Sequence, residues 1–144
     1  NHLLRYAIGS AAPAVNAPRI LLTTLPGEEH QLGLLMAQAY LSVEGVHCIS
    51  LGVQTPAFDI VRAVSALNAD IVGLSFSLAR QPRSVLAQLA ELREGLKPKV
   101  ALWAGGAIVG RLRKVPEGVR LLASLPEISQ ALADWRARRH AQAA

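Results

Sequence analysis

Apolar and polar residues follow two patterns along the chain, and segments of the two kinds alternate. Short runs that are almost wholly apolar predict buried strands, whereas longer segments with apolar residues at helical spacing predict helices. The expected strands are residues 19–25, 46–52, 70–77, 99–106 and 119–124. The expected helices are residues 32–45, 55–68, 81–96 and 125–139. We expect Thr55 to cap the second helix, with Pro56 at its first position.

This strand–helix alternation predicts an α/β fold in which helices cover both faces of a parallel sheet. With right-handed crossovers, five strands most often give a doubly wound, Rossmann/flavodoxin-like sheet in the order 2-1-3-4-5. We expect this domain to span residues 18–141. The Ala-rich residues 1–17 are expected to be a linker or the end of a preceding helical bundle. Because the chain starts with Asn1 rather than Met, we expect it to belong to a longer protein.

The composition fits one domain with a single continuous core. The chain has 144 residues, of which 51% are hydrophobic but only 4% aromatic, so Leu, Val, Ile and Ala must form the core. No apolar run approaches the ~20 residues that cross a bilayer, and we expect a soluble, cytoplasmic protein without membrane contact. Cys48 cannot form an internal disulfide, because it is the only cysteine, and is expected to be a buried, inert thiol.

The net charge of +5 raises the question of nucleic-acid binding. Basic residues concentrate in residues 110–120 and 134–140, but the aromatic residues that would stack on bases are nearly absent. We therefore interpret these segments as a solvated basic face. His2, His47 and His140 are expected to be ordinary surface or edge residues, and Trp103 and Trp135 to be packing residues.

Polar and small residues gather where three of the predicted strands end. Ligands of such sheets bind beyond the carboxyl ends of the strands, at the switch point between the first and third strands. Glu28, Glu29 and His30 leave the first strand. The third and fourth strands lead into Ser75, Ser77, Gly105, Gly106 and Ala107. Taken singly these residues have simpler explanations: a surface histidine, acids favoured near a helix N-terminus by ~0.3–1 kcal/mol, and glycines in turns.

Together, Glu28-x-His30-x-x-Gly33, Ser75 and Gly105-Gly106 resemble the signature of cobalamin-binding domains. That family's pattern is Asp-x-His-x-x-Gly, then Ser-x-Leu, then Gly-Gly, at matching spacings. The resemblance implies cobalamin as cofactor, with His30 as the lower axial ligand of cobalt in place of the cofactor's own dimethylbenzimidazole. It also implies that the nucleotide tail enters a slot beside the sheet.

The residue types suit these roles. Neutral imidazole is a good ligand for a borderline metal such as cobalt, and Glu28 could accept the hydrogen bond of its other nitrogen. Gly33 would leave the slot free, Ser75 would meet the tail, and Gly105 and Gly106 would leave room for its base and ribose. Two residues depart from the pattern: Glu28 replaces aspartate, and Ser77 replaces leucine, which predicts either an added polar contact or a differently shaped slot.

Within the family, "LTTLPGEEHQLGLLM…LGVQTP" is most similar to the carboxyl-terminal sensory domains of MerR-type transcription regulators, including light-responsive ones that use adenosylcobalamin. This implies a regulatory domain rather than an enzyme. It also implies a DNA-binding domain and a helical bundle elsewhere in the parent protein, with DNA contacted only through that protein and self-association left open. The alternatives are a corrinoid carrier domain of a methyltransferase or mutase, and an interaction domain whose site has decayed.

Overall fold

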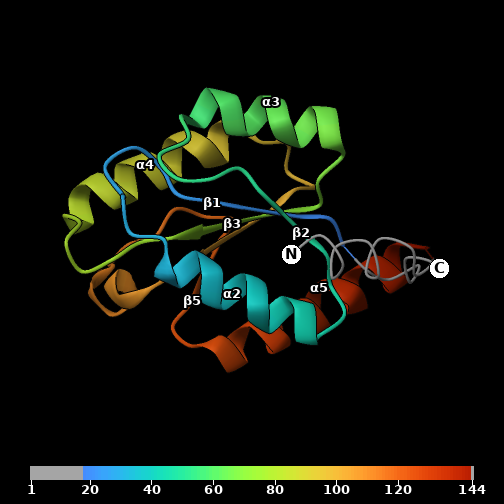
Figure 1. Cartoon of the computed structure of the whole chain (residues 1–144). Coiled ribbons are helices and arrows are strands. Elements are labelled where there is room, and N and C mark those ends of the chain that lie inside the picture. The colour runs from blue at the N-terminus through green and yellow to red at the C-terminus, as the bar shows by residue number, and fades with distance from the viewer. Residues whose placement is uncertain (1–17, 144) are drawn as a thin grey trace.

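The computed structural model describes residues 18–143, which form a five-stranded parallel sheet between two layers of helices (Figure 1). The strand order is β2-β1-β3-β4-β5, which confirms the predicted doubly wound topology. The strands are β1 (Ile20–Thr23), β2 (Cys48–Ser50), β3 (Ile71–Ser75), β4 (Ala101–Gly105) and β5 (Val119–Leu122). They are shorter than predicted because the apolar runs continue past the strands into the adjoining loops, where Leu25 and Phe76 are also buried.

The helices pair on the two faces of the sheet (Figure 1). One pair is α3 (Ala57–Leu67) and α4 (Pro82–Gly95), and the other is α2 (Leu32–Val43) and α5 (Leu125–Ala143). A short 3₁₀ helix, η1 (Ala107–Arg111), follows β4, where we predicted only an irregular connection. Among residues 18–143, no helix is both long and apolar enough to cross a membrane.

Burial on both faces explains why the strands read as continuous apolar runs. Leu21 of β1 packs in the core under α3 and α4, whereas its neighbours Ile20 and Leu22 pack in the core against α2 and α5. Trp103 and Trp135 are buried in this second core, as predicted. At ~25 cal/mol per Å² of apolar area removed from water, these two cores are the main stabilising contribution to the fold.

Helix α3, the second predicted helix, starts differently from the prediction. Its N-cap is Pro56, and no side chain caps it. The Thr55 hydroxyl instead lies 2.7 Å from the hydroxyl of Thr23, a buried residue of β1. The prediction that Thr55 is the cap was wrong because its side chain forms a hydrogen bond with the Thr23 hydroxyl instead of with the start of the helix.

Cys48 is buried, as predicted, and burial raises the pKa of its thiol to about 12. Burial disfavours the charged thiolate, which is the reactive form. We therefore expect iodoacetamide at mildly alkaline pH to leave the folded protein unmodified and to alkylate Cys48 once denaturant is added. Mass spectrometry of both samples measures this, and rapid modification of the folded protein would contradict the assignment.

His47 and His140 are exposed, as expected. His2 and the proposed linker of residues 1–17 lie outside the described residues.

Candidate functional site

A cavity of about 390 Å³ lies between the carboxyl edge of the sheet and the helices α2 and α5. Five of the residues predicted from the sequence line it: Gly33, Ser75, Gly105, Gly106 and Ala107. The remaining lining is mostly apolar and includes Leu22, Leu34, Met36, Leu41, Trp103 and Ile128. The structure therefore brings these predicted residues together around an apolar cavity, although they come from α2, β3 and the end of β4.

A side chain would meet different neighbours at each of the three glycines of the predicted motif. A Cβ at Gly33 would overlap the Ser75 hydroxyl, so a larger residue there would displace that side chain, which lines the cavity. Gly106 has a φ of +108°, and a Cβ there would overlap the backbone of Phe76. At Gly105, a Cβ would make only an ordinary contact, 3.4 Å from the Leu122 carbonyl oxygen. Gly33 and Gly105 both line the cavity and have no positive φ, whereas the backbone conformation at Gly106 itself favours glycine.

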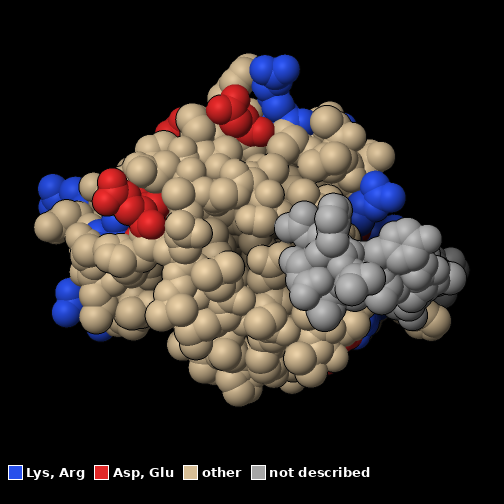
Figure 2. Space-filling view, in the orientation of Figure 1, with Lys and Arg blue, Asp and Glu red and all other residues tan. Residues whose placement is uncertain are grey.

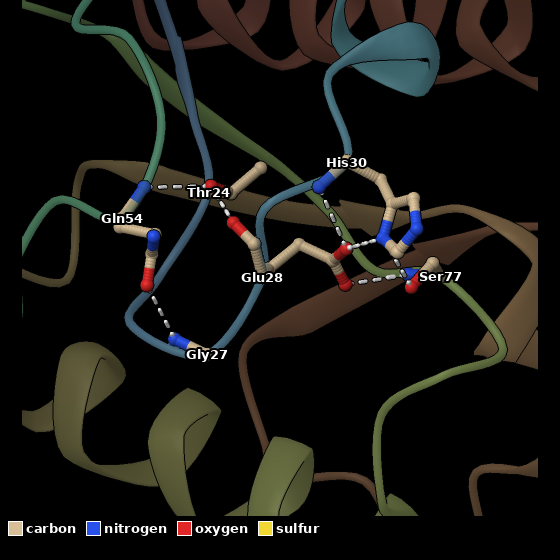
Figure 3. Close-up of polar contacts among 6 residues, drawn as sticks. All are labelled: Thr24, Gly27, Glu28, His30, Gln54 and Ser77. Carbon is tan, nitrogen blue, oxygen red and sulfur yellow. Dashed lines mark hydrogen bonds and ion pairs between the residues drawn. The ribbon is translucent and has the colours of Figure 1, made fainter.

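The other predicted polar residues, Glu28, His30 and Ser77, form a second cluster at the same edge (Figure 3). The Glu28 carboxylate is 1% exposed and lies 3.0 Å from His30 Nδ1 through Oε2. Its Oε1 accepts a 2.7 Å hydrogen bond from the Ser77 N–H, and the Ser77 hydroxyl lies 3.3 Å from His30 Nδ1. Glu28 is thus long enough to reach the imidazole although it replaces the aspartate of the motif.

The ionisation of Glu28 follows from these contacts. Burial alone would raise the pKa of its carboxyl, but hydrogen bonds from Ser77 and His30 outweigh burial and lower it. The group is therefore ionised at neutral pH and can only accept hydrogen bonds. In a neutral His30 the ring proton then lies on Nδ1, facing the carboxylate, and Nε2 keeps its lone pair.

The imidazole itself faces outward. His30 has a side-chain exposure of 68%, and no hydrogen bond to Nε2 occurs within residues 18–143. Figure 2 shows that charged side chains lie mainly toward the edges of the face that carries α2. Helix α2 itself contains no charged residue. An outward lone pair beside an apolar cavity suits a ligand that has a metal near Nε2 and an uncharged ring in the cavity.

The cavity and the polar cluster are joined by short pieces of chain. Ser75 lines the cavity, and Ser77, two residues later, contacts both Glu28 and His30. On the other side, Gly33 lines the cavity three residues after His30. One ligand could therefore occupy both parts.

Two residues that hold this cluster, Thr24 and Gln54, were not predicted from the sequence (Figure 3). Thr24 is fully buried and hydrogen-bonded to both Gln54 and Glu28. The signal that could have revealed it is the pair of threonines in an otherwise apolar strand. Gln54 gives no sequence signal, because its importance depends on which loop lies beside it.

The lowered pKa of Glu28 leads to a pH-dependent prediction for Glu28→Gln. An amide cannot accept hydrogen bonds at both of its ends, so one partly buried donor, the Ser77 N–H or the His30 Nδ1–H, loses its partner, at a cost of about 1 kcal/mol. A lowered pKa in the folded state contributes stability at neutral pH, and this contribution disappears as the pH falls below the ordinary value of 4.5 toward the folded value. Urea denaturation of both proteins across this range should show the difference narrowing toward acid. A constant difference would contradict the account.

Comparison with known proteins identifies the family. The model of the B12 binding domain family matches residues 18–114. The HTH-type transcriptional repressor CarH of Myxococcus xanthus is 40% identical over 97 residues, which are 67% of this chain and 32% of that protein. The repressor CarA of the same organism is 31% identical over 140 residues, which are 96% of this chain and 48% of that protein. The chain thus spans about a third to a half of these relatives.

Similarity extends to an enzyme and to a solved structure. Methionine synthase of Mycobacterium leprae is 30% identical over 94 residues, 65% of this chain but only 8% of that enzyme. The crystal structure of a cobalamin-binding protein from Desulfitobacterium hafniense DCB-2 superposes on 93% of this chain and 66% of that one, with a TM-score of 0.66 at 23% identity, and thus shares the fold. Because the family model covers well over half of the chain, the chain is a member of the B12-binding domain family, and its ligand is a corrinoid.

Proposed function

We propose that the domain binds cobalamin with His30 Nε2 as the lower axial ligand of cobalt and with the nucleotide tail in the cavity. The observation that carries this proposal is the contact between His30 Nδ1 and the buried Glu28 carboxylate, which leaves the outward Nε2 as an electron-pair donor. Histidine ligands of metals usually give their other N–H to such a partner. When bound, the corrinoid supplies a cobalt centre with an exchangeable upper ligand.

Each other member of the site has a part in this proposal. Ser77 donates its N–H to Glu28 and so keeps the carboxylate beside His30. Ser75 offers a hydroxyl to the tail, and Gly105, with Ala107, leaves room for it. The apolar walls of the cavity exclude water from the base at the end of the tail.

The biological role that we propose is regulatory. CarH and CarA are transcriptional repressors, and the chain spans about a third to a half of their length. We propose that residues 18–141 form the sensory domain of a cytoplasmic, MerR-type regulator, with residues 1–17 leading from a helical bundle and DNA contacted elsewhere in the parent protein. The corrinoid acts by binding one state of that protein more tightly than another, and so biases its self-association or DNA binding.

A corrinoid carrier is the second candidate, and the similarity to methionine synthase favours it. A carrier must present its cobalt to partner enzymes, whereas a regulator needs a binding site whose occupancy changes association. DNA binding of the full-length protein discriminates between them. We expect adenosylcobalamin to change operator affinity measured by electrophoretic mobility shift. An operator affinity that does not respond to the cofactor, or no DNA binding at all, would favour the carrier.

The regulatory proposal predicts that the longer parent protein binds adenosylcobalamin more tightly than the domain alone. A bundle that covers the upper side of the corrin would bury apolar area, and ~100 Å² corresponds to about 2.5 kcal/mol, nearly a hundredfold in affinity. We expect at least a tenfold difference, on the order of 1.4 kcal/mol, by isothermal titration calorimetry. Equal affinities would refute the cover and favour a self-sufficient carrier.

A further inference from the structure

The Thr24 hydroxyl joins the loop that carries His30 to the neighbouring loop between β2 and α3 (Figure 3). Thr24 follows β1 directly and is 0% exposed. Its hydroxyl accepts a 2.8 Å hydrogen bond from the Gln54 N–H and donates a 2.9 Å hydrogen bond to the Glu28 carbonyl oxygen. The backbone of Glu28 is therefore held by a buried hydroxyl that is itself held by another loop.

The loop between β2 and α3 makes further contacts with the same segment. The Thr55 N–H donates to the Thr24 carbonyl oxygen at 2.8 Å, and the Gln54 side chain accepts from the Gly27 N–H at 3.3 Å. Gln54 has a φ of +55°, a left-handed conformation that is uncommon for residues other than glycine. Such a conformation persists where surrounding contacts enforce it, and here those contacts lie against the segment that precedes His30.

These contacts form a continuous path to the imidazole. The Gln54 N–H fixes the orientation of the Thr24 hydroxyl, and that hydroxyl fixes the Glu28 carbonyl. The Glu28 carboxylate in turn receives both the N–H and the Nδ1–H of His30. Because the carboxylate and the carbonyl belong to one residue, a shift of the Glu28 backbone moves the acceptor that selects the His30 tautomer.

We propose that Thr24 is a positioning residue for His30. Its buried hydroxyl holds the Glu28 backbone so that the carboxylate keeps the proton of the imidazole on Nδ1 and directs Nε2 outward. The consequence for cobalt coordination rests on the proposed function, whereas the consequence for the His30 tautomer can be measured without any cofactor.

The chain provides a matched control in the preceding residue. Thr23 is also 0% exposed, and its hydroxyl also contacts the loop between β2 and α3, through the Gly52 carbonyl at 2.9 Å and the Thr55 hydroxyl at 2.7 Å. Within the described part of the chain its hydroxyl forms no hydrogen bond with Glu28 or His30, and its remaining contact is a long one of 3.4 Å to the Thr24 carbonyl oxygen. Thr23→Val and Thr24→Val thus remove the same group from adjacent buried positions, and only the second releases Glu28.

The experiment compares Thr24→Val, Thr24→Ser and Thr23→Val with the wild type. In the cofactor-free proteins, the ¹⁵N chemical shifts of the His30 ring report the tautomer. After addition of hydroxocobalamin, the absorption spectrum reports the ratio of histidine-on to histidine-off corrinoid. For Thr24→Val we expect a mixture of tautomers and a roughly tenfold lower histidine-on ratio, the lower end of the effects seen when partners of metal ligands are removed. Thr24→Ser should restore both readouts, and Thr23→Val should lose thermal stability without changing either.

Different outcomes would overturn the positioning role of Thr24 and the proposed cobalt ligation by His30. A Thr24→Val protein with the wild-type tautomer, or a Thr23→Val protein with the same change as Thr24→Val, would overturn the positioning role. Absence of histidine-on binding by the wild type would overturn the proposed function, and the tautomer measurement would still decide the role of Thr24.

If the Thr24→Val protein does not fold, a substitution at Gln54 tests the same proposal. Gln54→Gly removes the acceptor for the Gly27 N–H while glycine accommodates the φ of +55°, and we expect a smaller change in the same direction. Lys114→Gly is its control, because Lys114 has a φ of +54° and lies in the loop before β5. An unchanged tautomer in Gln54→Gly, or an equal change in Lys114→Gly, would contradict the proposal.

Discussion

His30→Ala should abolish histidine-on cobalamin while leaving the fold intact. The side chain is largely exposed, and it lies in a loop outside both apolar cores, so its loss removes little buried area. Without the imidazole that we propose as ligand, cobalt would keep the cofactor's own base or water as its lower ligand. Absorption spectroscopy after addition of hydroxocobalamin should show only the spectrum of the free cofactor, and circular dichroism should match that of the wild type.

His47→Ala is the matched control, because His47 is also an exposed histidine but precedes β2. It should bind hydroxocobalamin as the wild type does. A histidine-on spectrum that persists in His30→Ala would sink the assignment of the ligand, and a loss shared by both variants would point to a general effect on the protein.

Gly33→Leu should weaken cobalamin binding by about tenfold to a hundredfold, the range of 1–3 kcal/mol typical of overpacking. Even the Cβ would overlap the Ser75 hydroxyl, and the rest of the side chain would enter the wall of the cavity. The nucleotide tail would lose volume there, while His30 would remain in place. Isothermal titration calorimetry measures the affinity.

Cobinamide, a corrinoid without the nucleotide tail, distinguishes the causes. It should lose much less affinity for Gly33→Leu than cobalamin does, because it does not use the cavity. Equal losses for both corrinoids would show that the substitution acts through the packing of α2 against β3 instead. Thermal unfolding of the two proteins would then reveal a matching loss of stability.

The fold was predictable because its signals are local and agree with one another. Strands buried on both faces appear as apolar runs, as in Ile71–Ser75, and the alternation with helices permits few topologies. Two details were not predictable. The Thr55 hydroxyl contacts Thr23 across 32 residues of sequence, and the segment after Gly106 forms a 3₁₀ helix.

The candidate site was predictable only as a set of residues. The strand ends and the resemblance indicated Glu28, His30 and Ser77, but their mutual contacts depend on side-chain geometry. The backbone N–H of Ser77 reaches Glu28 as that of a leucine would, but the serine that replaces the leucine of the motif also brings a hydroxyl near His30, so the departure adds a polar contact. The pair of threonines at the end of β1 could have drawn attention to Thr24, but its contact with Glu28 depends on geometry that the sequence does not show.

The central claim is that the His30 imidazole coordinates cobalt, and electron paramagnetic resonance of cob(II)alamin bound to the domain tests it most directly. The protein would be labelled with ¹⁵N-histidine, while the cofactor keeps its natural ¹⁴N. Coordination by His30 predicts that each cobalt line splits into a doublet from ¹⁵N, and that the doublet disappears in His30→Ala. A triplet from ¹⁴N in the labelled wild-type protein would show that the cofactor's own base remains bound and would contradict the account.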